Sequence, residues 1–289
     1  VVANLVVIFT KASASAARIN EVFETQPSVQ EPAQASAAPV RGAPKIEFRN
    51  VSFGYGGERV LRDIDLKVQK GQTLGIIGTT GSGKSTLVNL IPRFYDVLQG
   101  EVLVDGVNVR EYPLSLLRGQ FGIVPQNAVL FSGTVGDNMR WAKEDATDHE
   151  IERALSIAQA DGFVKKLPFG IDTPITQGGK NLSGGQKQRL TIARALLRSP
   201  QILILDDSAS ALDFVTDAAL RKAIRTQTKE MTVLLVSQRV ATVRGADQIA
   251  VLDNGVLAGV GTHEELFASC KSYREICLSQ LSGQEVSAG

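Results

Sequence analysis

The sequence predicts an α/β fold in which helices cover a mainly parallel β-sheet. Apolar runs that do not alternate with polar residues indicate strands buried on both faces, and helical patterns between such runs can serve as crossovers. These runs lie at residues 74–77, 121–124, 202–205, 233–236 and 249–252. With 289 residues, of which 43% are hydrophobic, the chain can bury a sizeable core.

The first 44 residues differ in composition from the rest of the chain. Residues 1–24 open with "VVANLVVIF" and continue as an amphipathic helical pattern. The apolar stretch alone is too short to cross a bilayer, which takes about 20 residues. We therefore weigh two alternatives, a buried or frayed helix and the last turns of a membrane helix. Residues 25–44 are rich in proline and poor in large apolar side chains, which predicts a linker.

Three short stretches predict antiparallel pairing. The stretch "KIEFRNVSF", beginning at Lys45, alternates as a half-buried strand does, and "GEVLVDGVNV" predicts two short strands around an Asp105-Gly106 turn. Asn254-Gly255 predicts a further hairpin late in the chain.

Composition narrows the possible functions. The formal net charge of +1 argues against nucleic acid as a main partner. Cys270 and Cys277 are spaced so that they can share a helix face, which fits a reduced compartment without a disulfide or catalytic role. His149 and His263 each lie within a Thr-x-x-Glu capping box, so we expect exposed first-turn positions and no catalytic histidine.

The stretch "GTTGSGKST" carries the clearest chemical signal. It matches the phosphate-binding pattern G-x-x-x-x-G-K-[ST], follows the apolar run "TLGII" and precedes a helical pattern. Its glycines let backbone N–H groups turn towards phosphate oxygens at a helix N-terminus. We expect the lysine to reach the β- and γ-phosphates and the following serine to ligate Mg²⁺. The predicted nucleotide-binding residues are Gly78, Thr79, Thr80, Gly81, Ser82, Gly83, Lys84, Ser85 and Thr86.

Two adjacent carboxylates follow the apolar residues of "LILDDSASALD". In a phosphate-binding fold, Asp206 at the end of a neighbouring strand is expected to hold Mg²⁺, often through water. Asp207 points differently because successive strand residues alternate, and it stands where a general base or water-orienting group is needed. The alternative is a pair of helix-capping residues.

A second anion site is predicted at "LSGGQ", which opens an amphipathic helical pattern. Ser183 and Gln186 form a capping box, and Gly184 and Gly185 leave backbone N–H groups accessible. The alternative is an ordinary helix start. Because the chain's own phosphate loop already contacts the phosphates from one side, a second anion site suggests that two chains sandwich two nucleotides between them.

The phosphate loop, "LSGGQ", "ILILDD", "SALD" and "VPQ" together resemble the nucleotide-binding domain of an exporter-type ATP-binding-cassette transporter, over about residues 45–281. The resemblance implies a P-loop NTPase fold with a RecA-like core, an antiparallel β subdomain and an α-helical subdomain at about residues 127–197. Residues 282–289 would form a C-terminal tail. The N-terminal helix would end the last transmembrane helix of the same chain, and the domain would lie at the cytoplasmic face of a membrane.

The resemblance also assigns roles to residues outside the phosphate loop. ATP and Mg²⁺ are the implied cofactors, and Tyr55 would stack on the adenine. Gln126 would contact Mg²⁺ and sense the membrane domain, which places it with Ser85 and Asp206 among the metal-binding residues. Residues 210–213 would communicate with the opposite nucleotide site.

Two positions depart from the family pattern at the site of hydrolysis. Asp207 stands where the family usually has Glu, and Gln238 where it usually has a His that contacts the γ-phosphate. Asp is shorter by about 1.5 Å, and roughly 1 Å of misplacement of a general base can cost on the order of 100-fold in rate. Glutamine can donate a hydrogen bond but cannot carry a proton. With Gln126 as the third catalytic candidate, we predict a site that holds ATP and hydrolyses it poorly.

The intact Ser183 turn then predicts one half of a heteromeric exporter. In a head-to-tail pair this turn serves the P-loop of a second half-transporter, a non-identical subunit with Glu and His at the two catalytic positions. A homodimeric exporter with slow hydrolysis and a regulatory ATP-binding module remain alternatives. A DNA-maintenance ATPase would need a long coiled coil between Thr86 and Leu182, where no heptad run occurs.

Overall fold

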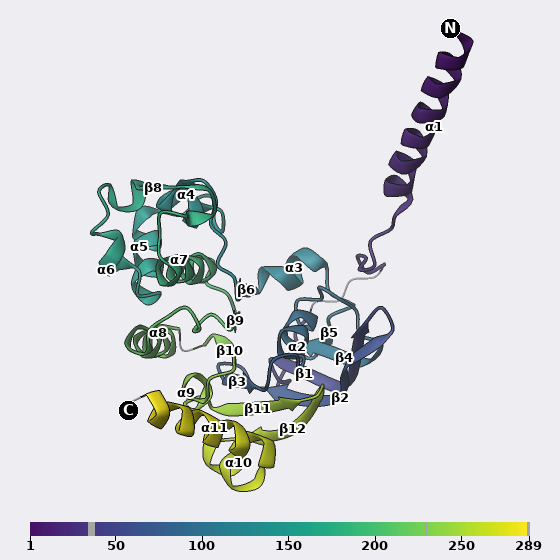
Figure 1. Ribbon diagram of the computed structural model, residues 1–289. Coiled ribbons are helices and arrows are strands. Elements are labelled where there is room, and N and C mark those ends of the chain that lie inside the picture. The colour runs from purple at the N-terminus through teal and green to yellow at the C-terminus, as the bar shows by residue number, and fades with distance from the viewer. Residues whose placement is uncertain (34–37, 229, 288–289) are drawn as a thin grey trace.

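The computed structural model describes residues 1–33, 38–228 and 230–287. Its centre is a six-stranded sheet with the strand order β12-β11-β3-β10-β9-β6 (Figure 1). The pairs from β11 to β6 are parallel, and β12 is antiparallel to β11. The predicted mainly parallel α/β fold is therefore confirmed. The strands are β3 (Thr73–Ile77), β6 (Phe121–Val124), β9 (Ile202–Asp206), β10 (Thr232–Ser237), β11 (Gln248–Asp253) and β12 (Val256–Gly261).

Burial on both faces explains the continuous apolar runs. Leu203 and Leu205 of β9 pack into a core shared with the helical layer. Their neighbours Ile202 and Ile204 pack into the opposite core, which is shared with the antiparallel sheet. Because successive strand side chains point to opposite faces, a strand covered on both sides needs an apolar residue at every position.

A separate antiparallel sheet has the order β2-β1-β4-β5. The predicted Asp105-Gly106 turn joins its last two strands, and Asn254-Gly255 joins β11 to β12; all four residues have positive φ, as tight hairpin turns require. Strict alternation in β1 is wrong, because its register against both neighbouring strands shifts after residues 48–49, and Asn50 has a φ of 46°. The strands are β1 (Ile46–Tyr55), β2 (Glu58–Val68), β4 (Gln99–Val104) and β5 (Val107–Asn108).

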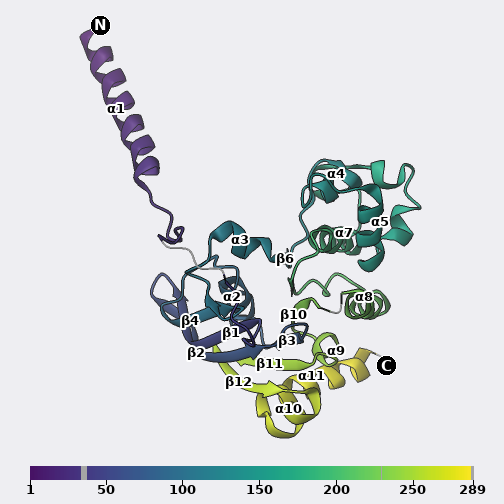
Figure 2. The ribbon, with the colours of Figure 1, turned by 180° about the vertical axis from the view of Figure 1, so that it is seen from behind.

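The remaining elements form layers on either side of the parallel sheet. In Figures 1 and 2, α4 to α7 form one helical layer. This layer, α8 and α9 to α11 all pack on one face of the parallel sheet, whereas α2, α3 and the antiparallel sheet cover the other face. The first layer also holds β7 (Gly133–Thr134), β8 (Pro174–Ile175) and two short 3₁₀ turns, η1 (Gly170–Asp172) and η2 (Gln177–Gly179). The helices of the folded part are α2 (Lys84–Leu90), α3 (Leu114–Gly119), α4 (Val135–Arg140), α5 (Asp148–Ile157), α6 (Asp161–Val164), α7 (Gly184–Leu197), α8 (Phe214–Gln227), α9 (Val240–Val243), α10 (His263–Ser269) and α11 (Lys271–Ser287).

The N-terminal helix α1 (Val2–Glu24) points away from the folded part in both views (Figures 1 and 2). None of its residues is buried against the described part of the chain. The helix has 23 residues, and an 18-residue window within it has a mean hydropathy of 1.3, which makes it long and apolar enough to cross a membrane by length and composition alone. The predicted linker follows, and its residues 34–37 lie outside the described part of the chain.

Lys45, the first residue after the linker, forms three hydrogen bonds with the folded part. Its ammonium group is 2% exposed and donates to Asp105 Oδ2 at 2.7 Å, Gln120 Oε1 at 2.9 Å and Gln201 Oε1 at 2.7 Å. Asp105 lies in the turn that joins β4 to β5 of the antiparallel sheet, whereas the two glutamines immediately precede β6 and β9. One buried charge therefore joins the two sheets.

Both predicted capping boxes around the histidines are confirmed. His149 is exposed as expected, but His263 is partly buried because its Nδ1 lies 2.8 Å from the hydroxyl of Tyr273 on α11. Cys270 is the C-cap residue of α10 and Cys277 lies in α11, so the prediction that the two share one helix face is wrong. Both cysteines are buried thiols outside any disulfide. Helix α11 continues past residue 281 to Ser287, and residues 288–289 of the expected tail lie outside the described part.

Candidate functional site

The P-loop connects β3 to α2. Gly81 and Gly83 have φ values of 81° and 98°, a conformation that side-chain-bearing residues rarely adopt. At Gly78 a Cβ atom would lie 2.1 Å from the carbonyl oxygen of Leu252 on the neighbouring strand β11. These three glycines therefore allow a turn that no other residue type fits without strain.

Lys84 begins α2 and turns its side chain back into this loop. Its Nζ donates to the carbonyl oxygens of Gly78 at 2.9 Å and Thr79 at 2.8 Å. Burial lowers the pKa of the ammonium group, and the nearby carboxylates of Asp207 and Asp206 oppose that shift. The loop thus holds a buried cation where the sequence predicted the phosphate contact.

The hydroxyl of Ser85 donates to Asp206 Oδ1 at 3.1 Å. Burial raises the pKa of Asp206, while the hydrogen bond from Ser85 and the charge of Lys84 act to lower it. Asp206 is the last residue of β9, two strands away from β3 in the sheet. The two predicted metal-binding groups therefore meet at the carboxyl end of the parallel strands, where ligands bind in open α/β sheets.

Asp207 is the first residue after β9, and its φ of 45° turns the backbone away from the extended strand conformation. Its carboxylate Oδ2 accepts a hydrogen bond from Gln126 Nε2 at 3.3 Å. Burial and the adjacent charge of Asp206 raise its pKa, against the opposing effects of Lys84 and Arg239. Gln126 follows β6, and the structure places its side chain beside Asp207, the residue after Asp206.

Gln238 follows β10 and points its side chain to the P-loop. Its Oε1 accepts from Thr80 Oγ1 at 3.3 Å, and its backbone carbonyl accepts from Gln280 Nε2 at 2.7 Å. Sequence reasoning named Gln238 and Thr80 but not their contact, and it missed Gln280 entirely. No local pattern reveals these contacts, because the partners are 158 and 42 residues apart in the chain.

Tyr55 ends β1 beside the P-loop. Its ring is 42% exposed and makes edge contacts with Phe53 and Tyr95, at centroid distances of 4.9 and 5.2 Å. Its hydroxyl lies 3.4 Å from Thr86 Oγ1. An accessible aromatic ring is therefore held next to the loop by Tyr95, a residue that the sequence analysis did not single out.

The Ser183 turn lies in the helical layer. The predicted capping box is confirmed, since the Ser183 side chain accepts from Gln186 N and the Gln186 side chain accepts from Ser183 N. A Cβ at Gly184 would meet nothing within 4 Å, whereas one at Gly185 would lie 3.1 Å from the carbonyl oxygen of Ala211. Figures 1 and 2 both show α7 on the far side of β9 and β10 from α2. The chain does not bring this turn to its own P-loop.

The residues of the P-loop fit a nucleoside triphosphate with Mg²⁺. Within the described residues, Ser82 Oγ is buried and has no hydrogen-bond partner, so the loop holds a polar atom that a phosphate oxygen could satisfy. The described part of the chain has no cluster of three or more His, Cys, Asp or Glu side chains suited to a metal ion. Mg²⁺ does not need one, because it commonly binds one or two carboxylates together with phosphate oxygens and water.

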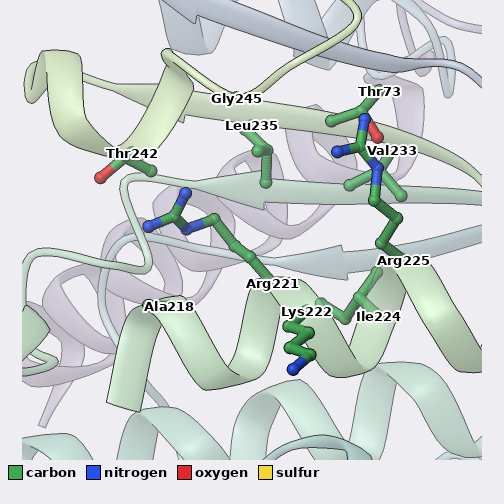
Figure 3. A pocket seen from close by; sticks show the side chains of 10 residues that line it. All are labelled: Thr73, Ala218, Arg221, Lys222, Ile224, Arg225, Val233, Leu235, Thr242 and Gly245. Carbon is green, nitrogen blue, oxygen red and sulfur yellow. The ribbon is translucent and has the colours of Figure 1, made fainter. Parts of the chain in front are cut away.

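A cavity of about 270 Å³ lies elsewhere, between α8 and the sheet (Figure 3). It contains none of the predicted site residues. Two cations on its wall are paired, Arg221 with Asp217 at 3.1 Å and Arg225 with Asp247 at 2.7 Å. Figure 3 shows Arg225 beside Thr73, at the end of β3 opposite to the P-loop. The phosphate site is therefore the loop itself and not this cavity.

Residues 61–210, more than half of the chain, match the family model described as "ABC transporter". The chain belongs to the ABC transporter family. An uncharacterized ABC transporter ATP-binding protein of Bacillus subtilis is 46% identical over 278 residues, which are 96% of this chain and 48% of that protein. Another uncharacterized ABC transporter ATP-binding protein, of Mycobacterium tuberculosis, is 44% identical over 278 residues, or 94% of this chain and 47% of its own.

Two further comparisons concern exporters. A Staphylococcus aureus protein, provisionally named a multidrug export ATP-binding/permease protein, is 44% identical over 80% of this ABC chain and 40% of its own length. A solved structure of a bacterial Atm1-family ABC exporter with ATP bound has a TM-score of 0.88 and 34% identity, covering 94% of this chain and 47% of that one. This ABC chain spans about half the length of the relatives that it matches.

Proposed function

We propose that the chain is the ATP-binding part of an ABC exporter, which couples ATP binding and hydrolysis at a dimer interface to export across a membrane. The convergence of Lys84, Ser85 and Asp206 at one P-loop carries the proposal. The names of the S. aureus and Atm1-family relatives support the exporter assignment. The exposed apolar helix α1 supports a connection to a transmembrane domain of the same chain, with the folded part at the cytoplasmic face.

In this proposal the P-loop, residues 78–86, holds the phosphates of ATP, and the exposed ring of Tyr55 stacks on the adenine. Ser85, Asp206 and Gln126 hold Mg²⁺. The metal supplies charge neutralisation on the β- and γ-phosphate oxygens. Lys84 keeps a positive charge inside the loop, and Ser82 donates to a phosphate oxygen from its buried position.

The chain's own site hydrolyses ATP poorly. In this proposal Asp207 occupies the general-base position with a side chain one methylene shorter than Glu, and its carboxylate already accepts a hydrogen bond from Gln126. The amide oxygen of Gln238 accepts a hydrogen bond from Thr80 of the P-loop. In this proposal its NH₂ group donates to the γ-phosphate, but the amide cannot take a proton. Both proton-handling positions are therefore substituted in the same site.

The Ser183 turn acts on the site of a second, non-identical subunit. Its capping box is intact, and α7, which it begins, lies on the far side of β9 and β10 from α2, which the P-loop precedes. At Gly184 nothing from the same chain lies within 4 Å of the Cβ position, which leaves room for a nucleotide bound to a partner. The partner subunit would hydrolyse with Glu and His at its own catalytic positions.

Steady-state ATP turnover tests the proposal. We expect the chain alone to turn over well below about one ATP per second, the lower end of ordinary enzyme rates. Asp207→Glu and Gln238→His should each recover little, whereas the double variant should raise turnover clearly. Ordinary turnover by the unaltered chain would instead support the homodimeric alternative, with two equivalent working sites.

A further inference from the structure

Helix α11 reaches the segment that carries Gln238. Gln280 on α11 uses both ends of its amide there: Nε2 donates to the carbonyl oxygen of Gln238 at 2.7 Å, and Oε1 accepts from the backbone N–H of Val240 at 2.9 Å. One side chain therefore fixes the backbone on both sides of Arg239.

This segment has little local support of its own. Helix α9 contains four residues, Val240–Val243, and its N-cap residue Arg239 makes no side-chain capping bond. The first N–H groups of a helix need partners from outside the helix, and so short a helix is not stable alone. Val243 of α9 is buried against the sheet and Arg239 N donates to Ser237 Oγ at 3.0 Å, while Gln280 supplies the missing acceptor at Val240. Helix α11 therefore contributes to the conformation of this segment.

Helix α11 is itself anchored next to the P-loop. Tyr273 and Cys277 are buried in a cluster with Ile77, the last residue of β3, and with Val243 of α9. Ser272 Oγ donates to Asp253 Oδ2 at 2.9 Å. The helix thus packs against β11 and α9 and shares a buried cluster with the end of the strand that leads into the P-loop.

A continuous set of contacts follows from α11 to the phosphate loop. Gln280 holds the backbone of Gln238, and the Gln238 side chain accepts from Thr80 Oγ1. We propose that Gln280 is a positioning residue that holds Gln238 towards the γ-phosphate end of the P-loop. The proposal rests on the function proposed above, in which Gln238 faces the γ-phosphate.

The test compares affinities for Mg-ATP and Mg-ADP by equilibrium titration of the chain, because the ratio reports γ-phosphate contact without requiring turnover. Gln280→Met keeps a similar length and volume but removes both hydrogen bonds. Lys271→Ala is the matched control, since Lys271 lies on the same helix with an 88% exposed side chain. We expect Gln280→Met to lower the ATP/ADP affinity ratio about fivefold, the factor for one lost hydrogen bond. Lys271→Ala should leave the ratio unchanged.

A double-variant cycle separates positioning from a general structural effect. If Gln280 acts through Gln238, Gln280→Met should have no further effect on the ratio once Gln238→Ala is present. Backbone hydrogen exchange at Val240 should also accelerate in Gln280→Met while the thermal unfolding midpoint stays close to that of Lys271→Ala. An unfolding midpoint that falls with equal losses of ATP and ADP affinity would overturn the positioning role.

The outcomes also distinguish the two proposals. A ratio that responds to Gln238→Ala but not to Gln280→Met overturns this inference and leaves the proposed function intact. A ratio that is insensitive to Gln238→Ala contradicts the γ-phosphate role of Gln238 in the proposed function itself.

Discussion

Ser85 Oγ lies 3.1 Å from Asp206 Oδ1, although the two residues are 121 positions apart in the chain. Ser85 lies in the first turn of α2, and Asp206 is the last residue of the parallel strand β9. The fold therefore brings the hydroxyl donor and the carboxylate acceptor to one edge of the sheet. Burial raises the pKa of Asp206 there. A divalent cation that replaced this hydrogen bond would offset the free-energy cost of burying the ionised carboxylate.

This arrangement predicts a pH-dependent metal effect. Mg²⁺ binds the ionised carboxylate, and because the pKa of Asp206 lies above its usual value, protonation on acidification begins at a higher pH than for an exposed aspartate. The gain in ATP affinity on adding Mg²⁺ should therefore be full near neutral pH and fall as the pH is lowered. Titrations with and without Mg²⁺ across this range measure it, and Asp206→Asn should remove the gain at every pH.

Replacing Lys84 with alanine should weaken ATP binding by roughly 10- to 100-fold, because hydrogen bonds to charged groups contribute about 1.5–3 kcal/mol. The buried Nζ lies inside the P-loop, where no other described lysine reaches. Lys70→Ala is the control, since the Lys70 side chain is 69% exposed and forms an ion pair with exposed Glu230. Equal affinities of Lys84→Ala and the unaltered chain would remove the phosphate role of this lysine.

The ring of Tyr55 should contribute to affinity by stacking, which is worth about 1–3 kcal/mol per base and tolerates any base. Tyr55→Phe should bind ATP almost normally, because the hydroxyl makes only a 3.4 Å contact with Thr86. Tyr55→Leu should bind ATP and GTP more weakly by similar factors. A Tyr55→Phe variant as weak as Tyr55→Leu would point to the hydroxyl and not to the ring.

The asymmetry of the proposed pair gives a ranked prediction for membranes that contain both subunits. Gly184→Asp should abolish transport and ATPase activity, because an acidic side chain would repel the γ-phosphate at the partner's site, where charge develops. Gly184 is a cleaner position than Gly185, whose Cβ would already crowd Ala211 within the chain. Asp207→Asn should leave most of both activities.

Gly162→Asp is the matched control for Gly184→Asp, since a Cβ at Gly162 also meets nothing within 4 Å and the residue lies in the same helical layer. If Asp207→Asn proves more damaging than Gly184→Asp, the chain's own site is the working one and the heteromeric assignment is wrong.

The features that could be predicted from the sequence are those determined by neighbouring residues. The glycines of the P-loop, the Asp105-Gly106 turn and the Ser183–Gln186 capping box each depend on local conformation, and the structure contains all of them. The parallel sheet could also be predicted, because burial on both faces leaves a continuous apolar pattern.

What could not be predicted depends on contacts between distant segments. The partial burial of His263 follows from Tyr273 on another helix, and the clamp on Gln238 comes from Gln280. The bulges of β1 arise from pairing with two strands at once, which interrupts the expected alternation. The two substituted positions, Asp207 and Gln238, were identified by comparison with a family pattern, and their neighbours became visible only in three dimensions.

The buried ammonium group of Lys45 has a mechanical consequence for the whole chain. A pull on α1 would be transmitted along the linker to the contacts of Glu31, Val40 and Lys45, and Lys45 is the residue immediately before β1. Because the same charge holds Asp105, Gln120 and Gln201, the load is shared between both sheets at their seam. The folded part would therefore follow a moving N-terminal helix as one body, with little unravelling at its edge.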